Sequence, residues 1–271
     1  GLVQANTAGY TITEGAIPGA SGTFNDGIDT LGNASVAAGS NAANDSFTGV
    51  RIAAAQQASG YLFGELPIAP ISGAVYIDSD RNNALDAGDA LRIAGVTLTL
   101  YGGSTCSGTV LQTQSTDAAG NYSFSGVSVG GTYSVCQTQP AAWGNGNASG
   151  VAGSNQIVVS NLALAGSAGN HFGELPATVA GSVFLDAANN GTRDGADTGL
   201  AGVVLTLSGT DIAGNTISRG ATTDAAGNFF FNDLPAANAG GYTVTEQSAQ
   251  PVVTIAGNAV TTLNGITTRG S

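Results

Sequence analysis

The sequence contains no lysine and no methionine, and it has one histidine and one tryptophan in 271 residues. All six basic residues are arginines, and 18 aspartates and glutamates bring the net charge to -12. Charged residues make up 9% of the chain, against roughly 25% in an ordinary globular domain. Because an acidic surface repels phosphate backbones, we expect no nucleic-acid partner. Multivalent cations fit this charge better, although acidic residues more often serve only to keep a surface soluble.

Long apolar runs are also absent. No stretch of 18 apolar residues occurs, so we expect no membrane insertion in this segment. No signal peptide is evident, and an export signal or an anchor could lie outside the sequence.

Cysteine is scarce, because Cys106 and Cys136 are the only two. Their spacing does not match a C-x-x-C metal motif. Both fall on or beside predicted strands of one repeat, which favours a disulfide that closes a loop of about 30 residues and is worth roughly 3 kcal/mol. Two buried free thiols are the alternative. A disulfide would place the chain outside the cytosol, so we expect an extracellular protein.

Internal repetition is the strongest pattern that is present. The segment Phe63-Gly-Glu-Leu-Pro67 recurs as Phe172-Gly-Glu-Leu-Pro176, an offset of 109 residues. Thr-Asp-Ala-Ala-Gly-Asn occurs at 116–121 and again at 223–228. We therefore expect three units: the C-terminal part of a repeat at 1–66, a complete repeat at 67–175, and a repeat without its closing strand at 176–271.

Each unit has the pattern of short β-strands. Apolar and polar residues alternate with period two in Val96-Thr-Leu-Thr-Leu100, and turn signals such as Ala-Gly-Asn separate the strands. Hydrophobic residues reach 42% of the chain, which argues against disorder despite 42 glycines. Several short strands in each repeat predict an all-β chain of tandem β-sandwich repeats.

Two matching acidic segments, 78–89 and 186–197, carry the clearest chemistry. Counted from the first Asp, oxygen side chains fall at positions 1, 3, 5, 9 and 12 in the first segment and at 1, 5, 9 and 12 in the second. With a backbone carbonyl at position 7, this is the spacing of a twelve-residue Ca²⁺ loop. The predicted ligands are Asp78, Asp80, Asn82, Ala84, Asp86 and Asp89 in the first loop, and Asp186, Asn190, Thr192, Asp194 and Asp197 in the second. Position 6 requires positive φ, which Gly191 adopts freely and Asn83 adopts more readily than most residues.

The alternative is a solvated turn rich in Asp and Asn, but its recurrence in register favours calcium. The second loop has Ala188 at position 3 and so lacks one ligand. We therefore expect the first loop to bind calcium more tightly. Strands rather than EF-hand helices flank both loops, so we expect the ion to serve as a structural staple.

These motifs resemble the B-type repeat of serine–aspartate-repeat surface proteins (SdrD B-like), which is related to the Cna-B fold. The resemblance rests on Gly73-Ala-Val-Tyr-Ile-Asp78, on the Asp loop, on Ala94-Gly-Val96, on the Thr-Asp-Ala-Ala-Gly-Asn turn and on the closing Phe-Gly-Glu. It implies an immunoglobulin-like sandwich, calcium at the Asp loop and a place at the bacterial cell surface. It also suggests Asp117 and Asp224 as additional ligands, although both could simply cap their own turns.

One departure from this family concerns cross-linking. Cna-B relatives often carry a Lys–Asn isopeptide bond, which cannot form without lysine. Calcium and the cysteine pair remain as the available staples.

We do not expect an enzyme. His171 matches Leu62 of the first copy, which favours a strand position over catalysis. Glu14, Glu65, Glu174 and Glu246 recur at strand ends, and recurrence in each repeat points to structure rather than to a glycosidase pair. Trp143 could stack on a sugar, but a lone tryptophan more often packs on its own domain.

Two functions remain in competition. The first is a calcium-stiffened stalk or filament whose partners are neighbouring repeats or other copies of the chain, assembled head to tail as residues 1–66 complete the third repeat of a neighbour. The second is an adhesin module that binds a host protein or glycan. A spacer in an enzyme ranks below both, and the sequence could also be a window of a longer tandem protein.

Overall fold

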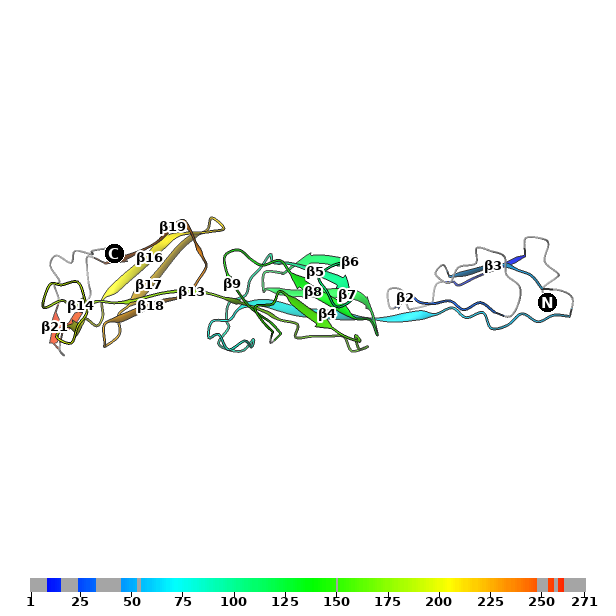
Figure 1. Cartoon of the computed structure of the whole chain (residues 1–271), viewed down its shortest axis with the longest axis horizontal. Coiled ribbons are helices and arrows are strands. Elements are labelled where there is room, and N and C mark those ends of the chain that lie inside the picture. Colours follow the sequence, from blue (N-terminus) through cyan, green and yellow to red (C-terminus); the bar gives the residue numbers. More distant parts are fainter. Residues whose placement is uncertain are drawn as a thin grey trace.

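The computed structural model describes residues 9–15, 24–32, 45–52, 55–149, 151–247, 253–255 and 258–260. Every regular element in these ranges is a β-strand. Three units follow one another along an elongated molecule, with the N-terminal unit and the third unit at opposite ends (Figure 1). The expected all-β class with tandem immunoglobulin-like sandwiches is confirmed. No helix in the described part of the chain is long and apolar enough to cross a membrane.

The N-terminal unit is a small set of strands that leads into the central unit. Its strands are β1 (Tyr10–Thr13), β2 (Phe24–Asp26), β3 (Ser46–Val50) and the start of β4 (Glu65–Ile77). β1 pairs with β3, and β2 pairs with β4. Phe47 is fully buried, and its ring centroid lies 5.2 Å from that of Tyr61 and 4.8 Å from that of Phe63. These three rings pack together in the described part of the unit.

The central unit is a sandwich of two sheets. Its remaining strands are β5 (Thr97–Gly102), β6 (Val110–Ser115), β7 (Asn121–Ser128), β8 (Tyr133–Gln137), β9 (Gly144–Ala148), β10 (Val151–Ala152), β11 (Gln156–Val159) and β12 (Phe172–Leu175). One sheet has the order β11-β8-β5-β6, and the other has β10-β9-β12-β4-β2 with β7 paired to β4. Leu98 and Leu100 are fully buried between half-buried threonines, as the period-two pattern predicted. They share one core with Ile71, Phe124 and Phe172 from the facing sheet.

The third unit repeats part of this scheme. Its strands are β13 (Ala177–Ser182), β14 (Phe184–Leu185), β15 (Thr198–Gly199), β16 (Val204–Asp211), β17 (Thr216–Thr222), β18 (Asn228–Leu234), β19 (Ala237–Glu246), β20 (Val253–Ile255) and β21 (Asn258–Val260). β16 lies between β17 and β19, as β5 lies between β6 and β8. β13 pairs with β18, as β4 pairs with β7. The expected lack of a closing strand concerns a segment that lies largely outside the described residues.

Continuous backbone and hydrogen bonds join the units. β4 runs without interruption across the predicted boundary between residues 66 and 67. Asn25 donates from Nδ2 to the Gly126 carbonyl and to Ser128 Oγ, at 3.0 and 2.7 Å. On the other side, the Ala236 N–H donates to the Ala142 carbonyl at 2.7 Å. These links favour a stiff array, while the unit boundaries stay a prediction.

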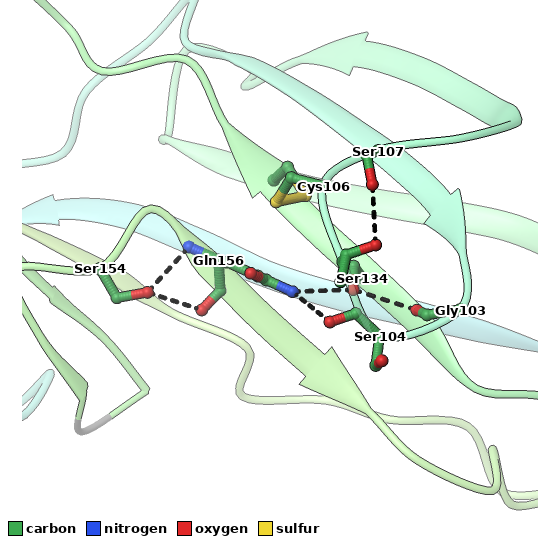
Figure 2. The surroundings of a disulfide bond; sticks show 9 residues. Gly103, Ser104, Cys106, Ser107, Ser134, Ser154 and Gln156 are labelled. Carbon is green, nitrogen blue, oxygen red and sulfur yellow. Dashed lines mark hydrogen bonds between the residues drawn. A yellow bond between two sulfur atoms is a disulfide. The ribbon is translucent and has the colours of Figure 1, made fainter.

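A disulfide joins Cys106 to Cys136, with a Cα–Cα distance of 5.8 Å, so the alternative of two free thiols is wrong. It ties the loop between β5 and β6 to the buried strand β8. Figure 2 shows the hydrogen bonds around it: Ser134 Oγ donates to the Gly103 carbonyl, and Gln156 Nε2 donates to Ser134 Oγ and to the Ser104 carbonyl. The bond therefore secures a loop that polar contacts also hold.

Candidate metal centres

The first Asp loop begins where β4 ends. The N–H of Asp78 donates to the backbone carbonyl of Glu174 on β12 at 2.9 Å, which fixes the start of the loop to the sheet. The loop closes when Asp89 Oδ1 accepts the N–H of Ser79 at 2.9 Å and Oδ2 accepts that of Asp86 at 3.3 Å. Asp78 and Asp89 are both fully buried. The fold thus holds two carboxylates away from water at the same point.

Three carboxylates converge in this loop. Asp78, Asp80 and Asp89 each offer an oxygen, and these oxygens lie within 4.8 Å of one another. Calcium takes six to eight oxygen ligands at about 2.3–2.6 Å, so one ion can contact oxygens separated by such distances. A Cβ at Gly88 would lie 3.2 Å from Asp80 Oδ2, so glycine keeps this side of the group open. The residues present therefore fit a calcium ion.

The other predicted ligands of this loop lie beside the three carboxylates. Asn82 Nδ2 donates to Asp80 Oδ2 at 2.9 Å and to Asp86 Oδ2 at 2.8 Å. Its Oδ1 accepts the N–H of Ala84 at 2.7 Å. The amide thus presents nitrogen to the carboxylates, and Asn82 must rotate before its oxygen can bind an ion. The Ala84 carbonyl stays a predicted ligand.

The electrostatics of Asp78 favour a bound cation. Burial raises the pKa of its carboxyl, and the charges of Asp89 and Asp80 raise it further. Hydrogen bonds from the backbone N–H groups of Asn83 and Asn82 act in the opposite direction. A dication would remove the repulsion among these charges and favour the ionised form.

The backbone of both loops turns as predicted at position 6. Asn83 has φ 64° and Gly191 has φ 73°. In each loop the first aspartate then accepts two N–H groups: Asp78 from Asn82 and Asn83, both at 3.1 Å, and Asp186 from Asn190 and Gly191, at 3.1 and 2.7 Å. The two segments therefore share one local frame.

The second loop brings fewer carboxylates together than the first, and they are less buried. Asp197 closes it by accepting the N–H groups of Ala187 and Asp194, both at 3.0 Å. Its first and last aspartates are only partly buried, and the N–H of Gly191 is the main cause that lowers the pKa of Asp186. Among the described residues, the groups of three carboxylates that could hold an ion do not include this loop. Asn190 Nδ2 donates to Asp194 Oδ2 at 3.2 Å, and the backbone N–H of Thr192 donates to Asn190 Oδ1 at 2.8 Å.

The two Thr-Asp-Ala-Ala-Gly-Asn turns have a local explanation. Asp117 Oδ1 accepts the N–H groups of Ala119 and Asn121, both at 2.8 Å. Asp224 makes the same two bonds within its own turn. Both aspartates cap their turns, and these contacts favour the structural role over ligation.

His171 and Trp143 both accept hydrogen bonds from residues of their own unit. His171 Nδ1 accepts the N–H of Ala74 at 3.1 Å, just before β12 begins, and burial lowers its pKa. Trp143 is partly buried, and its carbonyl accepts a bond from Gln139 Nε2 at 3.1 Å.

Sequence reasoning missed the burial of Glu174, which is 1% exposed. Burial raises the pKa of its carboxyl to about 7, although hydrogen bonds from Gln139 and Gln137 lower it. The recurring Phe-Gly-Glu motif was the available signal. Its partners could not be identified without knowing that the end of β8, in the other sheet, lies against β12.

Sequence reasoning also missed a second group of three carboxylates, Glu14, Asp45 and Glu65. The two glutamates stood out only as residues at strand ends, and nothing marked Asp45.

Comparison with known proteins adds distant relatives. Colossin-A of Dictyostelium discoideum is 29% identical in an alignment 184 residues long, which covers 63% of this chain and 2% of that protein's length. Among solved structures, the Bacillus anthracis TIE protein is 13% identical with a TM-score of 0.36, and the match covers 84% of this chain and 43% of that one. The shaft pilin SpaA from Lactobacillus rhamnosus GG is 16% identical with a TM-score of 0.29, and the match covers 66% of this chain and 87% of that one.

The family match is more extensive. The model of the SdrD B-like domain matches residues 69–170 and 177–263, which is most of the chain and includes both Asp loops. The chain therefore belongs to the SdrD B-like domain family.

Proposed function

We propose that this chain is a structural segment of an extracellular, cell-surface protein, and that calcium bound at its Asp loops stiffens the repeats into a stalk. Membership of the SdrD B-like family supports a structural or adhesion-related role rather than catalysis. Because the chain contains no lysine, it cannot form a Lys–Asn isopeptide bond. Calcium and the disulfide are the cross-links that remain available.

The observation that carries this proposal is the carboxylate group of the first loop. Asp78 and Asp89 are fully buried, and with Asp80 they bring three negative charges within 4.8 Å. Burying like charges without a counter-ion is unfavourable, and a hard dication that binds the folded form stabilises it by mass action. The ion would hold the 78–89 segment to the end of β4 and, through the Asp78–Glu174 backbone bond, to β12.

The two loops would bind calcium unequally. The second loop has the same backbone frame, but its aspartates are more exposed and Ala188 supplies no oxygen. Calcium sites of extracellular modules have Kd values of about 10⁻⁴–10⁻³ M. At tenfold excess over Kd, one site adds about 1.4 kcal/mol of stability.

Thermal unfolding with calcium and with chelator tests the calcium site. Calcium should raise the Tm of the wild-type central unit, and Asp78→Asn should remove that increase. Asp186→Asn should leave it in place, and Asp117→Asn serves as a charge-matched control outside the loops. A Tm of the central unit that is the same with calcium and with chelator would sink the proposal.

We also propose that the chain assembles head to tail by strand complementation. β3 pairs with β1 in the same arrangement in which β11 pairs with β8. β19 occupies the place of β8 in the third unit, and within the described ranges it pairs with β16 alone. Within the described ranges β3 pairs with β1 alone. A free strand edge recruits another strand, so the edge of β3 that faces away from β1 can add to β19 of the next copy while the β1–β3 pair stays intact.

Light scattering after size-exclusion chromatography tests this assembly. The 271-residue chain should form concentration-dependent oligomers, and a chain of residues 67–271 should stay monomeric. Oligomers that persist in the shorter chain, or a full-length chain that is monomeric at every concentration, would contradict strand complementation.

A further inference from the structure

A second group of carboxylates lies in the N-terminal unit, far from the Asp loops. Glu14 follows β1, Asp45 precedes β3 and Glu65 begins β4. Each offers an oxygen, and the three oxygens lie within 4.8 Å of one another. Strand pairing produces this convergence, because the N–H of Glu14 donates to the Asp45 carbonyl at 2.9 Å and β4 begins beside them.

A fourth carboxylate, Asp29, lies next to this group and is 4% exposed. Its Oδ1 accepts the N–H of Gly64, the residue before Glu65, at 3.1 Å. Its Oδ2 is buried and has no hydrogen-bond partner, and the same is true of Glu14 Oε2. Buried polar atoms nearly always have a partner, so these two unpaired carboxylate oxygens need an explanation.

The charges around Glu14 are consistent with this arrangement. Burial raises the pKa of Glu14, and the carboxylates of Glu65, Asp45 and Asp29 raise it further. Asp29 is therefore close enough to act on the group electrostatically as well as through Gly64.

The central unit provides an internal comparison. The N–H of Gln137 donates to the Asn155 carbonyl at 2.9 Å, just as Glu14 donates to Asp45. Glu174 takes the place of Glu65 in the repeated Phe-Gly-Glu segment. There, Gln137 Nε2 donates to Glu174 Oε1 at 2.6 Å. The same three positions thus hold two amides and one carboxyl in the central unit, but three carboxyls in the N-terminal unit.

We propose that Glu14, Asp45 and Glu65, with the buried carboxylate of Asp29 as their neighbour, form a further cation site that binds calcium. All the donors are carboxylate oxygens, which hard cations prefer, and no histidine or cysteine stands among them to favour zinc. The ion supplies the partner that the unpaired oxygens of Glu14 and Asp29 lack. It also ties the β1–β3 pair to β4, the strand that continues into the central unit, and so fixes the N-terminal unit to the rest of the array.

The test is hydrogen exchange followed by mass spectrometry on the whole chain, in 5 mM Ca²⁺ and in chelator. Calcium should slow exchange in peptides that cover β1 and β3 at least about fivefold, because ligand binding suppresses local opening. The variant E14Q/D45N carries the residues of the central unit at these positions, and it should lose this protection. Asp117→Asn, which removes a carboxylate from a turn of the central unit, should keep it.

In the same experiment, exchange in peptides from the 78–89 loop shows whether calcium binds the first Asp loop. The two proposed sites are therefore tested separately. Exchange in β1 and β3 that is equal with calcium and with chelator would overturn the inference. Slower exchange of β1 and β3 in acid without calcium would also overturn the inference. It would show that a shared proton, and not an ion, holds the three carboxyls together.

A second measurement covers the case in which E14Q/D45N weakens the N-terminal unit. Flow dialysis of a chain carrying D78N, D89N, D186N and D197N should still show one bound calcium ion per chain. Absence of any bound calcium would overturn the inference.

Discussion

Glu174 should make the stability of the central unit depend on pH, and Glu174→Gln should remove that dependence. The side chain is 1% exposed and receives hydrogen bonds from Gln137 and Gln139. Burial raises its pKa from 4.5 to about 7. Because the folded-state pKa lies above the unfolded value, folding favours the protonated form. The stabilisation is therefore full below pH 4.5, declines as the pH rises and is lost above about 7.

The size of the effect follows from the two pKa values. The difference between 4.5 and about 7 corresponds to about 3 kcal/mol. A charge inside a protein is screened more strongly than in a dry medium, which reduces this figure. We therefore expect the wild type to lose between about 1 and 3 kcal/mol relative to Glu174→Gln from pH 4 to pH 8. Near pH 4 the two proteins should be equally stable, because a protonated carboxyl and an amide have similar shape and neither carries charge.

Trp143 makes the measurement specific to the central unit. It is the only tryptophan in the chain, and its carbonyl accepts a bond from Gln139, which also contacts Glu174. Denaturant unfolding followed by tryptophan fluorescence, in chelator and at several pH values, gives the free energy for both proteins. A constant difference between wild type and variant from pH 4 to pH 8 would refute the reasoning.

Three further predictions concern the central unit. Replacing Cys106 and Cys136 by serine should lower the free energy of unfolding by about 3.5 kcal/mol, because the disulfide spans 30 residues; a loss under 1 kcal/mol in the fluorescence assay would contradict this. Phe124→Ala, at a fully buried site, should cost about 3–5 kcal/mol by the same assay, and tolerance of the change would show that the core is wrongly placed. Gly73→Ala should prevent native packing, because a Cβ there would overlap the Asn170 carbonyl; a wild-type Tm and circular dichroism spectrum would be inconsistent with the pairing of these segments.

Local patterns account for what the sequence predicted well. Period-two alternation identified β5, in which Leu98 and Leu100 are buried. The spacing of the Asp loops depends only on residues within twelve positions, so the positive φ at Asn83 and Gly191 could be predicted. The pairing of the two cysteines followed from their place in one repeat.

Long-range contacts explain what the sequence did not predict. Glu14, Asp45 and Glu65 meet only because β1, β3 and β4 bring them together. The contact of Glu174 with Gln137 likewise depends on side chains that point to one place between two sheets. The two Asp loops have nearly the same spacing, yet Asp78 is fully buried and Asp186 is only partly buried. The Asp78 N–H is bonded to the Glu174 carbonyl on β12, a long-range contact that the spacing does not predict.

The most direct test of the central claim is a crystal structure of the chain grown in calcium, with an anomalous difference map calculated for the first Asp loop. We expect a calcium peak at about 2.3–2.6 Å from carboxylate oxygens of Asp78, Asp80 and Asp89. A map with no anomalous peak among these three residues at millimolar calcium would contradict it.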